Sequence, residues 1–185
     1  MSGVVEGILG QLGPSGLSEI ATSLGADQGM VESAASAALP AIIAGMAKNS
    51  QQPQGAESLS KALGDHSPSI FDALGPILAG GGDGGKILGH ILGSNQKDVG
   101  QNISGQSGLD LGLVMKLLPI LAPLVMGYLS KEKEDKGLDA GGLGSMLDQE
   151  RSDAESKQPG LGGLAAILDG DGDGSIVDDI LGKFS

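Results

Sequence analysis

The feature that most constrains this fold is an internal repeat of helix stops and helix starts. Shifted by 83 residues, the chain matches itself without gaps at ten of the 41 positions in residues 8–48, which indicates a duplication. The matches pair Gly25 with Gly108 and Asp27 with Asp110. A glycine ends a helix at low conformational cost, and an aspartate shortly after it is a good N-cap for the next helix. Each segment is therefore predicted to form a helix, a turn and a second helix.

The two helices of a unit are expected to differ in burial. In the first unit, one apolar stripe recurs at helical spacing and consists of Leu17, Ile20, Ala21 and Leu24. The second helices, which include residues 28–47 and 113–129, are apolar around most of their circumference and should be central. Residues 113–129 are short for a membrane span and contain Lys116, so a buried or partner-facing helix is favoured. A membrane-associated segment is the alternative.

The linkers complete the predicted organisation, an all-α chain of two duplicated helix-turn-helix units. Residues 79–86, AGGGDGGK, are glycine-rich and predict a flexible hinge. Their GGGDGGK resembles part of a phosphate-binding loop, but Ile87 replaces the required Ser or Thr and no strand is expected before it. The predicted divisions are a first unit with a degenerate loop at 1–82, a second unit at 83–131, a flexible charged linker at 132–160, and a calcium loop with a C-terminal helix at 161–185.

The C-terminal sequence DGDGDGSIVDD, residues 169–179, predicts a calcium-binding loop. Asp169, Asp171 and Asp173 occupy positions 1, 3 and 5 of an EF-hand loop, and Gly174 occupies the turn position 6. Ser175 would contribute its backbone carbonyl at position 7. Three carboxylates at alternate positions repel one another unless a cation neutralises them, so we expect bound Ca²⁺.

The closing end of this loop departs from the EF-hand pattern. Ile180 stands at position 12 in place of the bidentate glutamate. Asp178 and Asp179, at positions 10 and 11, are the available closing ligands, as in shortened loops of the Excalibur type. The related segment at residues 64–72, GDHSPSIFD, has lost most of these acids and is expected to bind no calcium.

Composition excludes several classes of function. The formal net charge is −12 and Arg151 is the sole arginine, so no basic face is available for nucleic acid. The chain has no cysteine, which removes thiolate chemistry. Its two histidines, His66 and His90, lie in no recognisable metal-ligand spacing or catalytic arrangement, so no catalytic residue is assigned. The N-terminus lacks the pattern of a secretory signal, which favours a cytoplasmic protein.

Several segments together resemble a known family. They are ILGQLG near the N-terminus, LGADQGMVESAASAALPAIIAGMAKN, APLVMGYLSK and the closing DGDGSIVDDILG. They are similar to the bacterial YidB-like family, a domain of unknown function numbered 937, and the resemblance implies a helical bacterial protein without an assigned activity. From these observations we expect a calcium-binding, self-associating structural or assembly protein. A membrane-associated factor using residues 113–129 is the alternative, and an unrecognised enzyme is the least favoured one.

Overall fold

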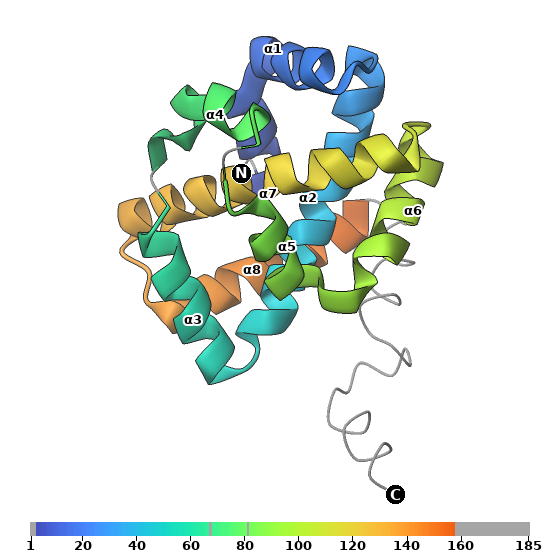
Figure 1. Ribbon diagram of the computed structural model, residues 1–185. Coiled ribbons are helices and arrows are strands. Elements are labelled where there is room, and N and C mark those ends of the chain that lie inside the picture. Colours follow the sequence, from blue (N-terminus) through green and yellow to red (C-terminus); the bar gives the residue numbers. More distant parts are fainter. Residues whose placement is uncertain (1–2, 67, 81, 158–185) are drawn as a thin grey trace, which may run out of the picture.

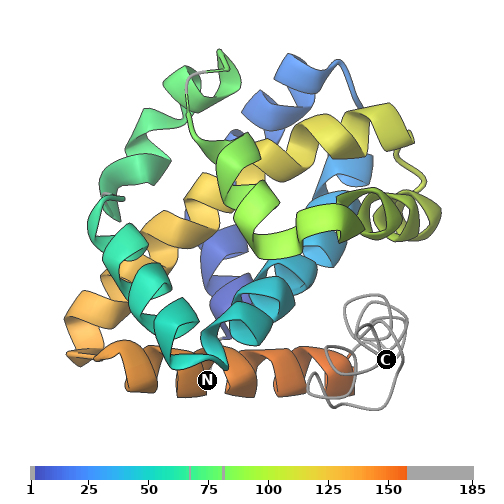
Figure 2. The same ribbon diagram turned by 60° about the horizontal axis from the view of Figure 1, so that its bottom comes forward.

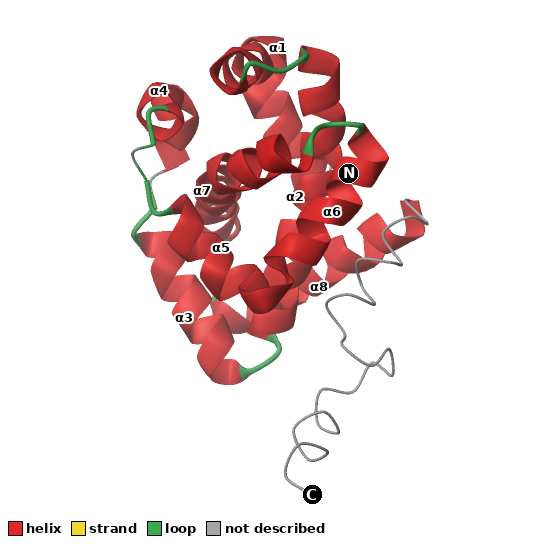
Figure 3. Ribbon diagram, turned by 45° about the vertical axis from the view of Figure 1, so that its right-hand side comes forward, coloured by secondary structure: helices red, strands yellow, loops and turns green. Residues whose placement is uncertain are grey.

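A computed structural model describes residues 3–66, 68–80 and 82–157. Over these residues the chain consists of helices joined by short turns, without a strand, as Figures 1 and 3 show. The predicted all-α class is therefore confirmed. The helices are α1 (Val4–Leu24), α2 (Gln28–Ser50), α3 (Pro53–Gly64), the 3₁₀ helix η1 (Pro68–Ala73), α4 (Leu74–Leu78), α5 (Gly84–Leu92), the 3₁₀ helix η2 (Gly93–Asn95), α6 (Gln96–Ser107), α7 (Leu111–Lys136) and α8 (Ala140–Lys157).

Helices α2 and α7 form the centre of the fold, as their apolar sequences predict (Figure 1). They contact each other, and α2 also contacts α1, α3, α5, α6 and α8. Their buried side chains, among them Leu39, Ile43, Leu117 and Leu121, belong to one continuous apolar core that includes residues from both predicted units. Aliphatic and methionine side chains supply this core, since the chain has few aromatic residues.

The predicted helix stops and starts are confirmed. Gly25 and Gly108 have left-handed backbones, with φ of 66° and 72°, and they end α1 and α6. Asp27 caps α2 by accepting a 3.2 Å hydrogen bond from the Met30 amide, and Asp110 caps α7 through the Gly112 amide at 2.8 Å. Each cap satisfies an amide that the first turn of a helix would leave unpaired. The origin of the two segments by duplication stays a prediction.

The covering of α7 changes the argument for self-association. Self-association through an apolar helix needs side chains that its own chain leaves uncovered, but Leu124, at the middle of α7, is fully buried by the chain itself. Among the described residues, the one large hydrophobic side chain that is exposed is Met30, at 46%. Helices α2 and α7 are long and apolar enough to cross a membrane by length and composition, yet 72% and 61% of their most apolar windows are buried inside the fold.

Residues 140–157 correct the prediction of an exposed, flexible linker. They form α8, which lies across one end of the bundle against α2 and α3 (Figure 2). Leu143 and Leu147, four residues apart on one face, are fully buried in the core. Glu150 of the same helix accepts a 2.8 Å hydrogen bond from the Val4 amide at the start of α1. Asp148, Glu150 and Arg151 of this segment are partly buried, as expected for a docked helix.

The glycine-rich segment at residues 79–86, predicted to be a flexible hinge, packs against the core at its C-terminal end. Gly80 and Gly82 turn the chain with positive φ angles of 83° and 158°, but Gly84 is buried at the start of α5. A Cβ atom at Gly84 would lie 1.9 Å from the carbonyl oxygen of Pro119 in α7. Glycine is required here because the backbones of α5 and α7 approach each other closely, which fixes α5 on the core.

Candidate functional site

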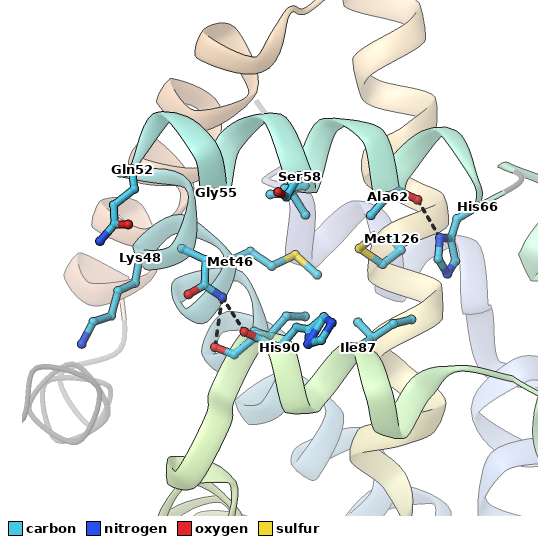
Figure 4. A pocket seen from close by; sticks show the side chains of 13 residues that line it. Met46, Lys48, Gln52, Gly55, Ser58, Ala62, His66, Ile87, His90 and Met126 are labelled. Atoms are coloured by element: carbon cyan, nitrogen blue, oxygen red, sulfur yellow. Dashed lines mark hydrogen bonds between the residues drawn. The ribbon is translucent and has the colours of Figure 1, made fainter.

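A cavity of about 440 Å³ opens between α3 and α5, above the central helices. Figure 4 shows α3 on one side and α5 on the other, with side chains of α2 and α7 between them. We call it the α3–α5 groove. Its lining side chains are apolar (Met46, Leu59, Ala62, Ile87, Ile91 and Met126) or polar (Lys48, Asn49, Gln52, Ser58, His66 and His90), and Gly55 completes it.

Two methionines form the floor of the α3–α5 groove. Met46 comes from α2 and Met126 from α7, and their exposed fractions are 1% and 2%. Their side chains lie between α3 and α5 in Figure 4. Methionine is flexible and polarisable, so it can adapt its shape to an apolar surface placed on it. The floor is thus suited to contact with an apolar molecule.

Close backbone contacts hold the two walls of the groove. A Cβ at Gly55 of α3 would lie 1.8 Å from the Asn49 carbonyl oxygen of α2. A Cβ at Gly45 of α2 would lie 3.0 Å from the Ile91 carbonyl oxygen of α5 and 2.6 Å from the Cγ2 atom of the same residue. The Asn49 side chain also donates hydrogen bonds to the carbonyl of His90 at 2.8 Å and, more weakly, to that of Ile91 at 3.4 Å. The last turn of α2 therefore positions both α3 and α5.

The far side of α3 is also fixed. Lys133 of α7 donates a 2.9 Å hydrogen bond from Nζ to the carbonyl oxygen of Ser60. Leu63, one turn later on α3, is fully buried in the core. Contacts on both sides of α3 keep the groove open at a defined width, so the cavity is preformed.

Both histidines of the chain line this one groove. His66 follows α3 and is half-buried, while His90 lies on α5 and is exposed. Nδ1 of His66 is 2.8 Å from the carbonyl oxygen of Ala62. Because a carbonyl can only accept, this nitrogen carries the proton, and Nε2 of the neutral ring is an acceptor. Figure 4 shows His66 near the end of α3 and His90 on the opposite wall.

The groove differs from the chain as a whole in the kinds of ionisable side chain that it contains. The sequence contains 23 acidic and 11 basic residues. None of the described residues that line the groove is acidic, and three of them, Lys48, His66 and His90, are basic side chains. The groove therefore presents the chain's scarce basic groups around an apolar floor.

The residues predicted to bind calcium lie outside the described part of the chain. These are Asp169, Asp171, Asp173, Ser175, Asp178 and Asp179. Within the described ranges, no group of three or more histidine, aspartate or glutamate side chains is placed to hold a metal ion. The degenerate segment 64–72 contributes His66 to the groove and the start of η1, whose Phe71 packs on the core.

Sequence reasoning did not anticipate the pairing of the histidines. They are 24 residues apart, with no motif linking them, and only the packing of α3 beside α5 brings them to one cavity. The short helix α4 precedes the glycine-rich segment. Gly80, Gly82 and Lys116 line a second cavity of about 390 Å³ beside α7.

Fold and groove together define a helical protein with a preformed, methionine-floored cavity on its central helices. The chain belongs to the family described as bacterial protein of unknown function (DUF937), whose family model matches residues 6–132. That range contains every residue that we name in the lining of the α3–α5 groove. No match is found among curated proteins or among solved structures.

Proposed function

We propose that this protein binds one small, mainly apolar molecule in the α3–α5 groove. The observation that carries the proposal is the cavity of about 440 Å³ with Met46 and Met126 as its floor. Cavities of roughly 300–1,000 Å³ with an apolar lining and a few polar groups are the usual form of small-molecule sites.

The rigidity of the walls supports the same proposal. Asn49 joins α2 to α5 through its side chain, and Gly55 brings α3 against the same turn of α2. When a ligand binds to a preformed cavity, the protein loses little conformational entropy, because the site is already ordered. More of the contact free energy between the groove and a ligand would therefore appear as binding affinity.

The test uses three probes of equal chain length, octanoate, 1-octanol and octylamine, titrated into the full chain by calorimetry. Binding of at least one probe at one site per chain is expected. Methionine methyl groups labelled with ¹³C then locate the site, because Met46 and Met126 should shift while Met30, which does not line the groove, should not. Absence of binding by all three probes, or shifts confined to Met30, would reject the proposal.

A matched pair of variants on α3 adds a steric test. Ser58 and Glu57 are neighbouring exposed residues, and only Ser58 is among the residues lining the groove. Ser58→Trp should obstruct the groove and weaken probe binding at least tenfold, whereas Glu57→Trp should leave it unchanged. Equal affinities of the two variants would place the bound probe elsewhere on the molecule.

A second proposal, carried by the sequence, is that the chain binds one calcium ion at residues 169–179. Its support is the alternation of Asp169, Asp171 and Asp173 before a turn glycine. Calcium at a hundredfold excess over Kd should stabilise the fold by about 2.7 kcal/mol if folding and binding are linked. Calorimetry should give one ion per chain, Asp171→Ala should abolish most of the affinity, and Asp153→Ala on α8 should not. No heat with wild type would end this proposal.

A further inference from the structure

The charge and hydrogen-bonding groups of the α3–α5 groove narrow the chemistry of its ligand. We propose that the groove takes an apolar carboxylate, whose alkyl or aryl body lies over Met46 and Met126 and whose carboxylate lies beside His66 and His90. This inference rests on the proposed function, since it names the class of ligand for the same site.

The first argument is charge complementarity. The chain carries a formal net charge of −12, so a basic cavity without acidic lining residues is contrary to its average composition. An amine would find no carboxylate among the described residues that line the groove. A carboxylate would find His66 and His90 on opposite walls of the groove, as Figure 4 shows. The positive charge of a protonated histidine in a partly dehydrated cavity favours a carboxylate over a hydroxyl or an amine headgroup.

The second argument is the hydrogen bond of His66. Its Nδ1 donates to the Ala62 carbonyl, so Nε2 can donate to a ligand only when the ring is protonated. Two carboxylate oxygens offer acceptors that a protonated Nε2 can bind through a charge-assisted hydrogen bond. A carboxylate that accepts a hydrogen bond from Nε2 therefore requires the protonated form of the ring. The other titratable groups that line the groove are Lys48 from α2 and His90 from α5, and α7 contributes the uncharged Met126.

This coupling fixes the sign of the pH dependence. Histidine changes its charge between about pH 5 and 8, whereas a simple carboxylate stays ionised through that range. A ligand that binds together with a proton loses affinity as the pH rises. The affinity for octanoate should therefore fall between pH 6 and 8, by at most about tenfold per pH unit for one proton. The affinity for 1-octanol should not change.

The experiment compares octanoate, 1-octanol and octylamine on the full-length chain by calorimetry at pH 6, 7 and 8. Octanoate is expected to bind at least tenfold more tightly than either other probe at pH 6. At pH 7, titrations in two buffers with different ionisation heats should show proton uptake with octanoate alone. These comparisons use wild-type protein, so they do not depend on whether any variant folds.

Two variants assign the effect to the groove. His66→Gln should remove most of the proton uptake and reduce the preference for octanoate at least fivefold. Lys97→Gln, which removes an exposed positive charge on α6 outside the groove, should retain both the proton uptake and the preference. A change of equal size in Lys97→Gln would show that the overall charge of the chain causes the preference, and would overturn the inference.

The outcomes separate the two proposals. If the three probes bind with equal affinity, or if octanoate binds without proton uptake, the carboxylate inference is wrong while the apolar groove remains a ligand site. If octylamine binds most tightly, the assigned ligand charge is wrong. If none of the probes binds, the proposed function fails and this inference fails with it.

Discussion

Gly55→Ala is the sharpest test of how the groove is built. A Cβ at this position would lie 1.8 Å from the Asn49 carbonyl oxygen, whereas real Cβ contacts essentially never fall under 3.0 Å. Helix α3 would have to move by the difference, 3.0 − 1.8 = 1.2 Å, because the obstructing atom belongs to the backbone and cannot rotate away. That movement is opposed by the bond from Lys133 to Ser60 and by the burial of Leu63.

The expected loss of stability follows from two opposing terms. Overpacking of a well-packed contact costs about 1–3 kcal/mol, and a rigid backbone obstacle belongs at the upper end of that range. Alanine is the better helix former by about 1 kcal/mol, which offsets part of the cost. The net loss should be about 2 kcal/mol, or about 4–8 °C in Tm for a chain of this size.

Gly64→Ala is the matched control on the same helix. A Cβ there meets no atom within 4 Å, so this variant should be as stable as wild type or slightly more stable. Urea denaturation followed by circular dichroism at 222 nm gives both free energies of unfolding. Probe binding should weaken in Gly55→Ala alone, since α3 forms one wall of the groove. If Gly55→Ala is as stable as Gly64→Ala and binds normally, the close contact does not position α3.

Three further predictions test the rest of the fold. Gly84→Ala should destabilise the chain by about 1–3 kcal/mol through its contact with α7, and Gly85→Ala, with open space around its Cβ, should not; equal melting temperatures would contradict the close approach. Burial, and then the negative charge of Glu132, raise the pKa of Tyr128 above its ordinary value of 10.0. The contribution of Tyr128 to the free energy of unfolding is therefore complete below pH 10.0 and is lost as the pH rises through the folded-state pKa. Absorbance at 295 nm reports this sole tyrosine, and a native midpoint at or below the denatured one would refute the direction. Because α8 is docked, Leu147→Ala should lower the free energy of unfolding in urea by about 2–5 kcal/mol, whereas a substitution at an exposed residue, Gln149→Ala, should change it little. An unchanged free energy of unfolding in Leu147→Ala would instead support the interpretation of this segment as a flexible linker.

The boundaries of the central helices could be predicted because their signals are local. Gly25 and Gly108 end helices through their own backbone freedom, and Asp27 and Asp110 cap the following helices within two or three residues. The apolar circumference of residues 113–129 likewise predicted a central helix. Such features need no knowledge of distant partners.

Helix α8 shows where local reasoning was insufficient. Its sequence is rich in charge and glycine, which was interpreted as an exposed linker, although Leu143 and Leu147 have helical spacing. Two buried leucines stabilise a helix only if another surface covers them, and α2 and α3 supply that surface. Helix propensity alone is weak compared with such packing.

The α3–α5 groove was decided entirely by tertiary structure. His66 and His90 belong to different helical segments, and Met46 and Met126 come from the two central helices, 80 residues apart in sequence. The residue types were visible in the sequence, but their meeting depends on the close approaches at glycines and on the side chain of Asn49. The local sequence indicated where α1 and α6 end, where α2 and α7 begin, and that α2 and α7 are central, since those signals act over one or two turns. Only the packing of whole helices, with each close contact depending on the shape of its partner, determined that one cavity would contain both histidines.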